Sequence, residues 1–175
     1  MKSSLTAFTA LAYVLLALLT GAKTCAETPL PISERDAGSN LNYKQSEAEG
    51  ALQIGLSHIA SSIYQELLKG IGENNATRED LLLGLASAQI SQGLVEDANR
   101  TLARVKNMDS SRFLLRRVLI DYYSDNLDGL SRNLSNISLA DLPNQERGWL
   151  QLLKAISLLA NNKPDLADKE FEKAK

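Results

Sequence analysis

The chain contains very few of the residues that build catalytic and metal sites. It has a single histidine, His58, and a single cysteine, Cys25, among 175 residues. His58 lies near the start of a predicted helix, a position that favours a solvent-facing or capping role over acid-base chemistry. One histidine could hold zinc only with three carboxylates, which no motif here brings together. Glycine-rich phosphate loops and the G-x-S-x-G nucleophile pattern are also absent. We therefore predict no catalytic, cofactor-binding or metal-binding residues, and a protein that is not an enzyme.

An excess of charge of either sign is also missing. The chain carries 19 basic and 21 acidic residues, which gives a net charge of −2. Proteins that bind nucleic acid usually gather lysine and arginine on one face. No basic stripe of this kind occurs in the sequence, so we predict no nucleic-acid partner.

The one long hydrophobic run lies at the N-terminus. Lys2 precedes an uncharged stretch rich in leucine and alanine that extends to Ala22, and a triplet of small residues ends at Ala26. This order predicts a secretory signal peptide over residues 1–26, whose removal leaves no integral membrane span. An uncleaved membrane anchor is the alternative, because about 20 apolar residues can span a bilayer. Lipid attachment at Cys25 is disfavoured, because a lysine and a threonine precede it.

Cleavage after Ala26 removes the only cysteine, so disulfides cannot hold the exported protein together. Burial alone must do so, which favours a bacterial periplasm; secretion and attachment to the cell envelope are the alternatives. Residues 27–42, ETPLPISERDAGSNLN, combine two prolines and a glycine with small polar residues and predict a flexible leader. Residues 43–175 then form the predicted folded domain.

Four similar segments recur in that domain. They are GLSHIASSIYQEL from Gly55, GLVEDANRTLARV from Gly93, DNLDGLSRNLSNI from Asp125 and NKPDLADKEFEKA from Asn162. The turn-forming residues that begin them are 38, 32 and 37 positions apart. We number each repeat from its turn residue.

Three anchors follow every turn residue, at positions +5, +9 and +12. Steps of four and three place these anchors on one face of an α-helix. The +5 anchors are Ala60, Ala98, Leu130 and Ala167. A second helical pattern precedes each turn, and its anchors at position −7 are Ala48, Ala86, Val118 and Ala155. The small anchors predict close crossings between the two helices.

This unit resembles the tetratricopeptide repeat (TPR) family, whose helical hairpin of about 34 residues has small residues at these positions and an aromatic residue in its second helix. Of the four residues at position −4, only Leu158 has the large apolar side chain that the family carries there. The resemblance implies an all-α protein, an α-solenoid of about four helix-turn-helix hairpins over residues 43–175. An irregular helical bundle is the alternative.

The resemblance also implies a groove, lined by the first helix of each hairpin, that takes a protein or peptide partner. The family's groove positions correspond here to Glu49, Leu52, Ser87, Ile90, Arg112, Leu119, Tyr122, Trp149, Ile156 and Leu159. Tryptophan, tyrosine and arginine are frequent anchors at interfaces. Our candidate groove residues are Arg112, Tyr122, Trp149, Ile90 and Ile156. Packing between neighbouring repeats is the alternative role for Trp149 and Tyr122.

We therefore expect an exported TPR-like interaction module that needs no cofactor, a periplasmic adaptor or assembly scaffold. One alternative is the N-terminal repeat region of a longer exported enzyme or cell-envelope protein whose activity lies beyond residue 175. Another is a structural subunit that self-associates through its last hairpin. In that hairpin we expect Leu152, Leu159 and Leu166 to offer apolar surface that no following helix covers. The end of a solenoid usually requires a capping helix to cover such a surface.

Overall fold

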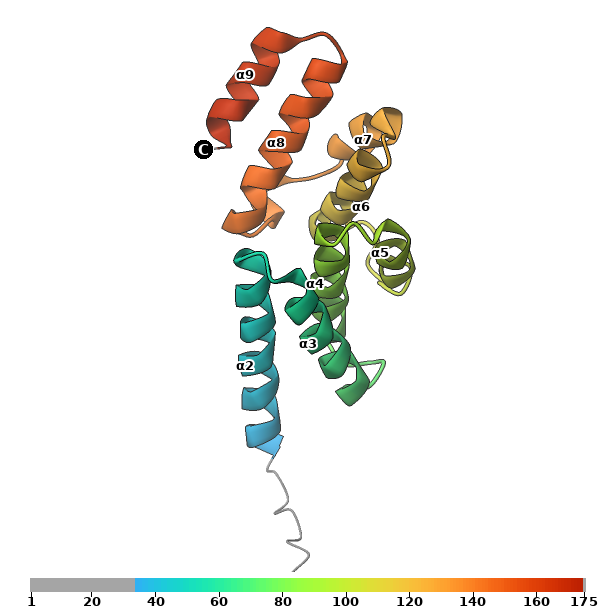
Figure 1. Cartoon of the computed structure of the whole chain (residues 1–175), viewed down its shortest axis with the longest axis vertical. Helices are drawn as coiled ribbons and strands as arrows, with labels where there is room; N and C mark the ends of the chain where they lie inside the picture. The colour runs from blue at the N-terminus through green and yellow to red at the C-terminus, as the bar shows by residue number, and fades with distance from the viewer. Residues whose placement is uncertain (1–33, 175) are drawn as a thin grey trace, which may run out of the picture. The chain divides into compact units, whose positions relative to one another are not determined.

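The structure, a computed structural model, describes residues 34–174 and is helical throughout this part of the chain (Figure 1). No strand occurs among these residues, and from Ala37 onward the helices form one compact unit. The elements are α2 (Glu34–Gln53), α3 (Ser57–Gly70), α4 (Arg78–Ser91), α5 (Val95–Leu102), α6 (Ser111–Tyr123), α7 (Leu127–Leu134), the short 3₁₀ helix η1 (Leu139–Asp141), α8 (Asn144–Ala160) and α9 (Pro164–Lys173). The prediction of an all-α protein is confirmed. None of these helices combines the length and the hydrophobicity that a bilayer crossing demands.

The helices follow one another as hairpins, α2 with α3, α4 with α5, α6 with α7 and α8 with α9 (Figure 1). Within the first hairpin, Lys44 Nζ on α2 lies 2.6 Å from Glu66 Oε1 on α3. Each hairpin also packs on the next, through contacts of α3 with α4, α5 with α6 and α7 with α8. Helix α6 contacts both α4 and α8, so the first helices of the second, third and fourth hairpins are neighbours. The described fold is therefore repeat-like as well as helical.

The four turns have the same backbone conformation. The turn residues have positive φ angles: 82° at Gly55, 74° at Gly93, 55° at Asp125 and 56° at Asn162. This left-handed region is open to glycine and is the one that asparagine and aspartate enter most readily among other residues. In all four turns, the amide after the turn residue donates to the carbonyl five residues before it, at 2.8 to 2.9 Å. This is the Schellman arrangement that ends a helix, and it explains why the sequence places Gly, Gly, Asp and Asn at these positions.

The predicted helix-crossing anchors are buried in every hairpin. None of the eight has any exposed surface: Ala48, Ala60, Ala86, Ala98, Val118, Leu130, Ala155 and Ala167. Small side chains at these points let two helices approach closely, and the larger side chains at +9 fill the space beside the contact. Those +9 anchors are buried at Tyr64, Leu102 and Leu134, and Phe171 in the last hairpin is half-buried.

Polar pairs replace the large apolar residue at position −4 in two hairpins. In the second hairpin, the buried Gln89 Oε1 accepts a hydrogen bond of 2.7 Å from Thr101 Oγ1. In the third, the buried Asp121 accepts from Asn133 Nδ2 at 2.8 Å and from Asn126 Nδ2 at 2.9 Å. Thr101 and Asn133 both occupy position +8, so the two hairpins bridge their helices at equivalent places. These satisfied polar groups avoid the cost of an unpaired buried donor or acceptor, so polar residues can be buried at position −4.

Helix α2 begins at Glu34, so helical structure extends into the stretch 27–42 for which we predicted a flexible leader. Gly38, Ser39, Asn40 and Asn42 have low intrinsic helix propensity, so the sequence of this stretch does not indicate a helix. Leu41 packs against the core and supplies tertiary support that propensity does not count. The predicted signal peptide at 1–26 and the rest of the leader lie outside the described residues.

The apolar side of the last hairpin is exposed in part. Leu159 and Leu166 are both close to half exposed, whereas Leu152 is half-buried. Self-association through these residues stays a prediction.

Candidate binding groove

A groove of about 480 Å³ runs across the first helices of the four hairpins. Helices α2, α4, α6 and α8 all contribute side chains to it, and Tyr64 reaches it from α3. Gln53 Nε2 on α2 donates a hydrogen bond of 3.0 Å to Gln145 Oε1 on α8, and both residues line the groove. The first and last hairpins therefore meet at its edge.

The lining residues recur at the same repeat positions. Position −6 supplies Glu49, Ser87 and Leu119; position −2 supplies Gln53, Ser91 and Tyr123; position −13 supplies Asp80, Arg112 and Trp149. A shared register arises because hairpins of similar internal geometry present equivalent positions to the same side of the array. The groove is therefore a product of the repeat rather than of one irregular loop.

Three of the five candidate residues lie in the groove and two do not. Arg112, Ile90 and Trp149 line it; Ile90 is almost completely buried, whereas Trp149 is 52% exposed. Tyr122 and Ile156 are not among the lining residues. Whether the residues that line the groove bind a partner stays a prediction.

Tyr122 and Ile156 lie outside the groove lining for different physical reasons. One residue along a helix turns the side chain by about 100°, and Tyr123 rather than Tyr122 faces the groove. The two rings meet edge to face, with centroids 5.4 Å apart and planes at 65°. Helix α8 lines the groove only as far as Trp149, and Ile156 lies in its later part, where α8 packs on α9.

A buried arginine joins three hairpins beside the groove. The guanidinium of Arg116 on α6 donates to both carboxylate oxygens of Glu146 on α8, at 2.8 and 2.5 Å. Its Nε donates to Ser87 Oγ on α4 at 3.0 Å, and its Nη1 also donates to the carbonyl oxygen of Arg112 at 2.9 Å. Only 6% of the Arg116 side chain is exposed. Bidentate, multiply bonded geometry of this kind is what a buried guanidinium requires.

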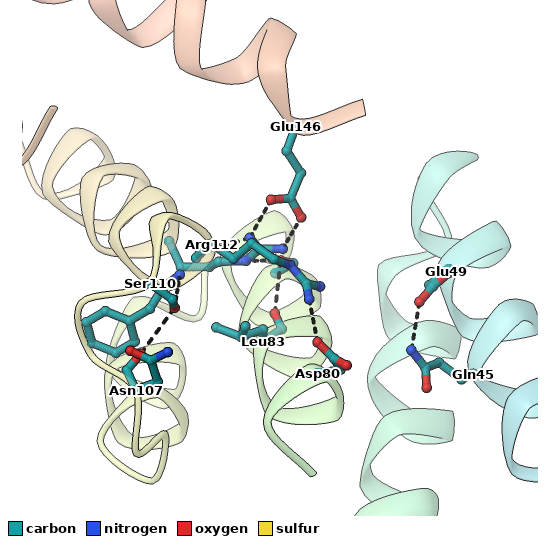
Figure 2. Close-up of polar contacts among 11 residues, drawn as sticks. Gln45, Glu49, Asp80, Leu83, Asn107, Ser110, Arg112 and Glu146 are labelled. Carbon is teal, nitrogen blue, oxygen red and sulfur yellow. Dashed lines mark hydrogen bonds and ion pairs between the residues drawn. The ribbon is translucent and has the colours of Figure 1, made fainter. Parts of the chain in front are cut away.

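A second ion pair lies nearer the solvent. Arg112 on α6 pairs with Asp80 on α4, and Figure 2 shows the two side chains joined, with Glu146 reaching down from α8 beside them. About a third of the Arg112 side chain and somewhat more of Asp80 are exposed. The Arg112 Nε is buried and has no hydrogen-bond partner among the described residues. Both residues occupy position −13, so one repeat position carries opposite charges in adjacent hairpins.

The remaining charge in the groove is Glu49 on α2. Its Oε1 accepts a hydrogen bond of 3.0 Å from Gln45 Nε2 one turn earlier, a contact visible in Figure 2. No ion pair to Glu49 occurs within the described part of the chain. The groove thus holds two neutralised arginines and one carboxylate without a cationic partner.

Tyr64 closes the floor of the groove against a glycine. Its side chain is 2% exposed, and a Cβ placed on Gly84 of α4 would lie 2.6 Å from Cε1 of the ring. Burial raises the pKa of Tyr64 to about 12, and the nearby Glu49 carboxylate adds to the increase. Arg116 and Arg112 oppose it. The hydroxyl is therefore held neutral in the field of the groove's charges.

The raised pKa of Tyr64 predicts a loss of stability at alkaline pH. The unfolded chain ionises its tyrosines near pH 10, whereas folded Tyr64 stays neutral to about pH 12. Below pH 10, Tyr64 is neutral in both states and causes no loss of stability. Between pH 10 and 12 it ionises in the unfolded chain only, so the free energy of unfolding decreases, by about 1.4 kcal/mol at pH 11. Urea unfolding measures the free energy of unfolding at pH 9 and at pH 11. Between these two values it should decrease by about 1.4 kcal/mol more in the wild-type protein than in Tyr64→Phe. Equal decreases would mean that the Tyr64 hydroxyl is solvated in the folded protein.

Other polar candidates do not assemble near the groove. His58 is exposed in the first turn of α3 and does not line it. Within the described residues, no three His, Cys, Asp or Glu side chains gather in a way that could hold a metal ion.

Several groove residues were not selected from the sequence, among them Arg116, Glu146, Asp80 and Tyr64. Arg112, Asp80 and Trp149 share position −13, and extending the register to that position would have found Asp80. Tyr64 was identified as a packing anchor at +9, but its contact with the groove depends on the missing side chain of Gly84. No sequence pattern marks the pairing of Arg116 with Glu146, because it joins different hairpins.

Comparison with protein-family models, with curated proteins and with solved structures gives no match. The TPR resemblance therefore stays a prediction from the repeat positions in the sequence.

Proposed function

We propose that the protein is an exported TPR-like α-solenoid that binds a segment of a partner protein in the groove across its first helices. It acts as an adaptor or assembly scaffold, and the periplasm is the compartment that suits its sequence. The export signal is inferred from residues 1–26 alone.

The observation that carries this proposal is the repeated register of the groove. Three repeat positions each supply lining side chains from three successive hairpins, as expected for a concave solenoid surface. Four turns of equal geometry and eight buried crossing anchors support the TPR-like assignment of the hairpins. A groove whose lining combines apolar, aromatic, polar and charged side chains is suited to recognising a peptide segment.

Trp149 is the expected anchor of the interaction. It is an exposed aromatic side chain that lines the groove, and residues of this type contribute a large share of binding energy at interfaces. Peptides selected from a random library by the purified protein should bind Trp149→Ala at least about 10-fold more weakly. Circular dichroism should show unchanged helicity, because the ring is half exposed.

Tyr43→Ala is the matched control for that experiment. Tyr43 is also an exposed aromatic residue but lies outside the groove lining, so its removal should leave peptide affinity unchanged. Equal losses in both variants, or selected peptides that bind Trp149→Ala normally, would place the binding surface elsewhere.

A further inference from the structure

The charges of the groove determine what kind of segment it can accept. Arg112 is neutralised by Asp80, and Arg116 by Glu146. Glu49 is exposed and is bonded only to the amide of Gln45 among the described residues. A partner carboxylate placed there would be repelled, whereas a cationic side chain would find an open acceptor.

Two exposed aromatic rings line the same groove. Trp149 on α8 is 52% exposed and Tyr123 on α6 is 50% exposed. The face of an aromatic ring attracts lysine and arginine side chains, by about 0.5 to 2 kcal/mol depending on solvation. Leu52 and Leu119 lie in the lining as well and offer contact to apolar side chains.

The size of the groove limits the conformation of its occupant. An α-helix is about 10 Å wide and rises about 1.5 Å per residue, so a volume of 480 Å³ accommodates roughly one turn of it. A short extended segment places alternate side chains on the two sides of its backbone and fits such a space better.

We propose that the groove selects a short extended segment of a partner protein with a lysine or arginine flanked by apolar residues. The cationic group pairs with Glu49, the aromatic rings of Trp149 and Tyr123 lie against the basic residue and its neighbours, and the leucines take the apolar flanks. This inference rests on the proposed function, because it names the chemistry of the segment that the groove binds.

Trp149 provides a direct readout, because it is the only tryptophan in the chain. Titration of its fluorescence with three capped peptides, Leu-Pro-X-Pro-Leu with X as arginine, norleucine or glutamate, compares the charges in a backbone that proline keeps extended. We expect the arginine peptide to bind at least about 10-fold more tightly than the glutamate peptide, with norleucine between them.

Glu49→Gln should reduce the preference for arginine over glutamate to about three-fold or less. Glu47→Gln is the matched control, because it removes the same charge from an exposed position on the same helix outside the groove lining, and it should keep the full preference.

The outcomes separate this inference from the proposed function. Equal affinity for the arginine and norleucine peptides, or an identical effect of the two glutamate variants, would overturn the basic preference and leave peptide binding intact. Failure of all three peptides to bind would overturn the inference as well, whereas the library selection with Trp149→Ala decides the proposed function by itself.

Discussion

Replacing Arg116 with alanine is expected to lower the free energy of unfolding by about 3 to 5 kcal/mol, the largest effect of any single substitution considered. The change removes the only cation paired with Glu146 among the described residues, so a carboxylate whose side chain is only 18% exposed in the intact protein loses its compensation. It also removes hydrogen bonds to Ser87 on α4 and to the backbone of α6. Urea unfolding followed by circular dichroism measures the difference.

Two further variants identify the cause of that loss. Arg112→Ala removes another arginine of α6, but its ion pair with Asp80 on α4 is partly exposed to solvent, so the change should cost about 1 kcal/mol or less. Glu146→Gln added to Arg116→Ala should recover part of the stability, because the unpaired charge is removed. If Arg116→Ala and Arg112→Ala lowered the free energy of unfolding equally, the buried network around Arg116 would not be what holds the hairpins together.

Gly84→Ala is expected to destabilise the protein by about 2 kcal/mol, although alanine is the better helix former. In an open helix interior, this change gains about 1 kcal/mol. At Gly84 the new methyl group would lie 2.6 Å from Cε1 and 2.8 Å from the hydroxyl oxygen of Tyr64, so the buried ring must move. Overpacking of this kind costs about 1 to 3 kcal/mol or more. At Gly84 we expect this cost to exceed the gain in helix propensity.

Gly50→Ala gives the matched comparison. Gly50 also lies within a helix, α2, and a Cβ placed there meets nothing within 4 Å. This variant should be more stable than the wild-type protein by about 0.5 to 1 kcal/mol. A stabilising Gly84→Ala would show that Tyr64 does not pack on α4 as described.

The features that sequence predicted well are those set within a single hairpin. The turn residues Gly55, Gly93, Asp125 and Asn162 were identifiable because a left-handed conformation restricts the choice of residue. The crossing anchors were identifiable because a close approach of two helices demands small side chains at fixed spacing. Both constraints act over a few residues and leave a periodic trace.

Features set by the stacking of hairpins left no such trace. Arg116 contacts residues about 30 positions away on each side, and nothing in its local sequence indicates a buried role. Position −3 supplies Leu52 and Ile90 to the groove but not Tyr122, whose neighbour Tyr123 lines it instead.

Photo-crosslinking in the cells that produce the protein tests the central claim, that the groove is the partner-binding surface, most directly. A photoreactive residue at Ser91, exposed in the groove lining, is compared with one at Arg100, exposed on α5 outside it. We predict that Ser91 captures a defined partner protein, that Arg100 does not, and that Trp149→Ala abolishes the capture at Ser91. Capture of the same partner from Arg100, or capture at Ser91 that persists in Trp149→Ala, would contradict the account.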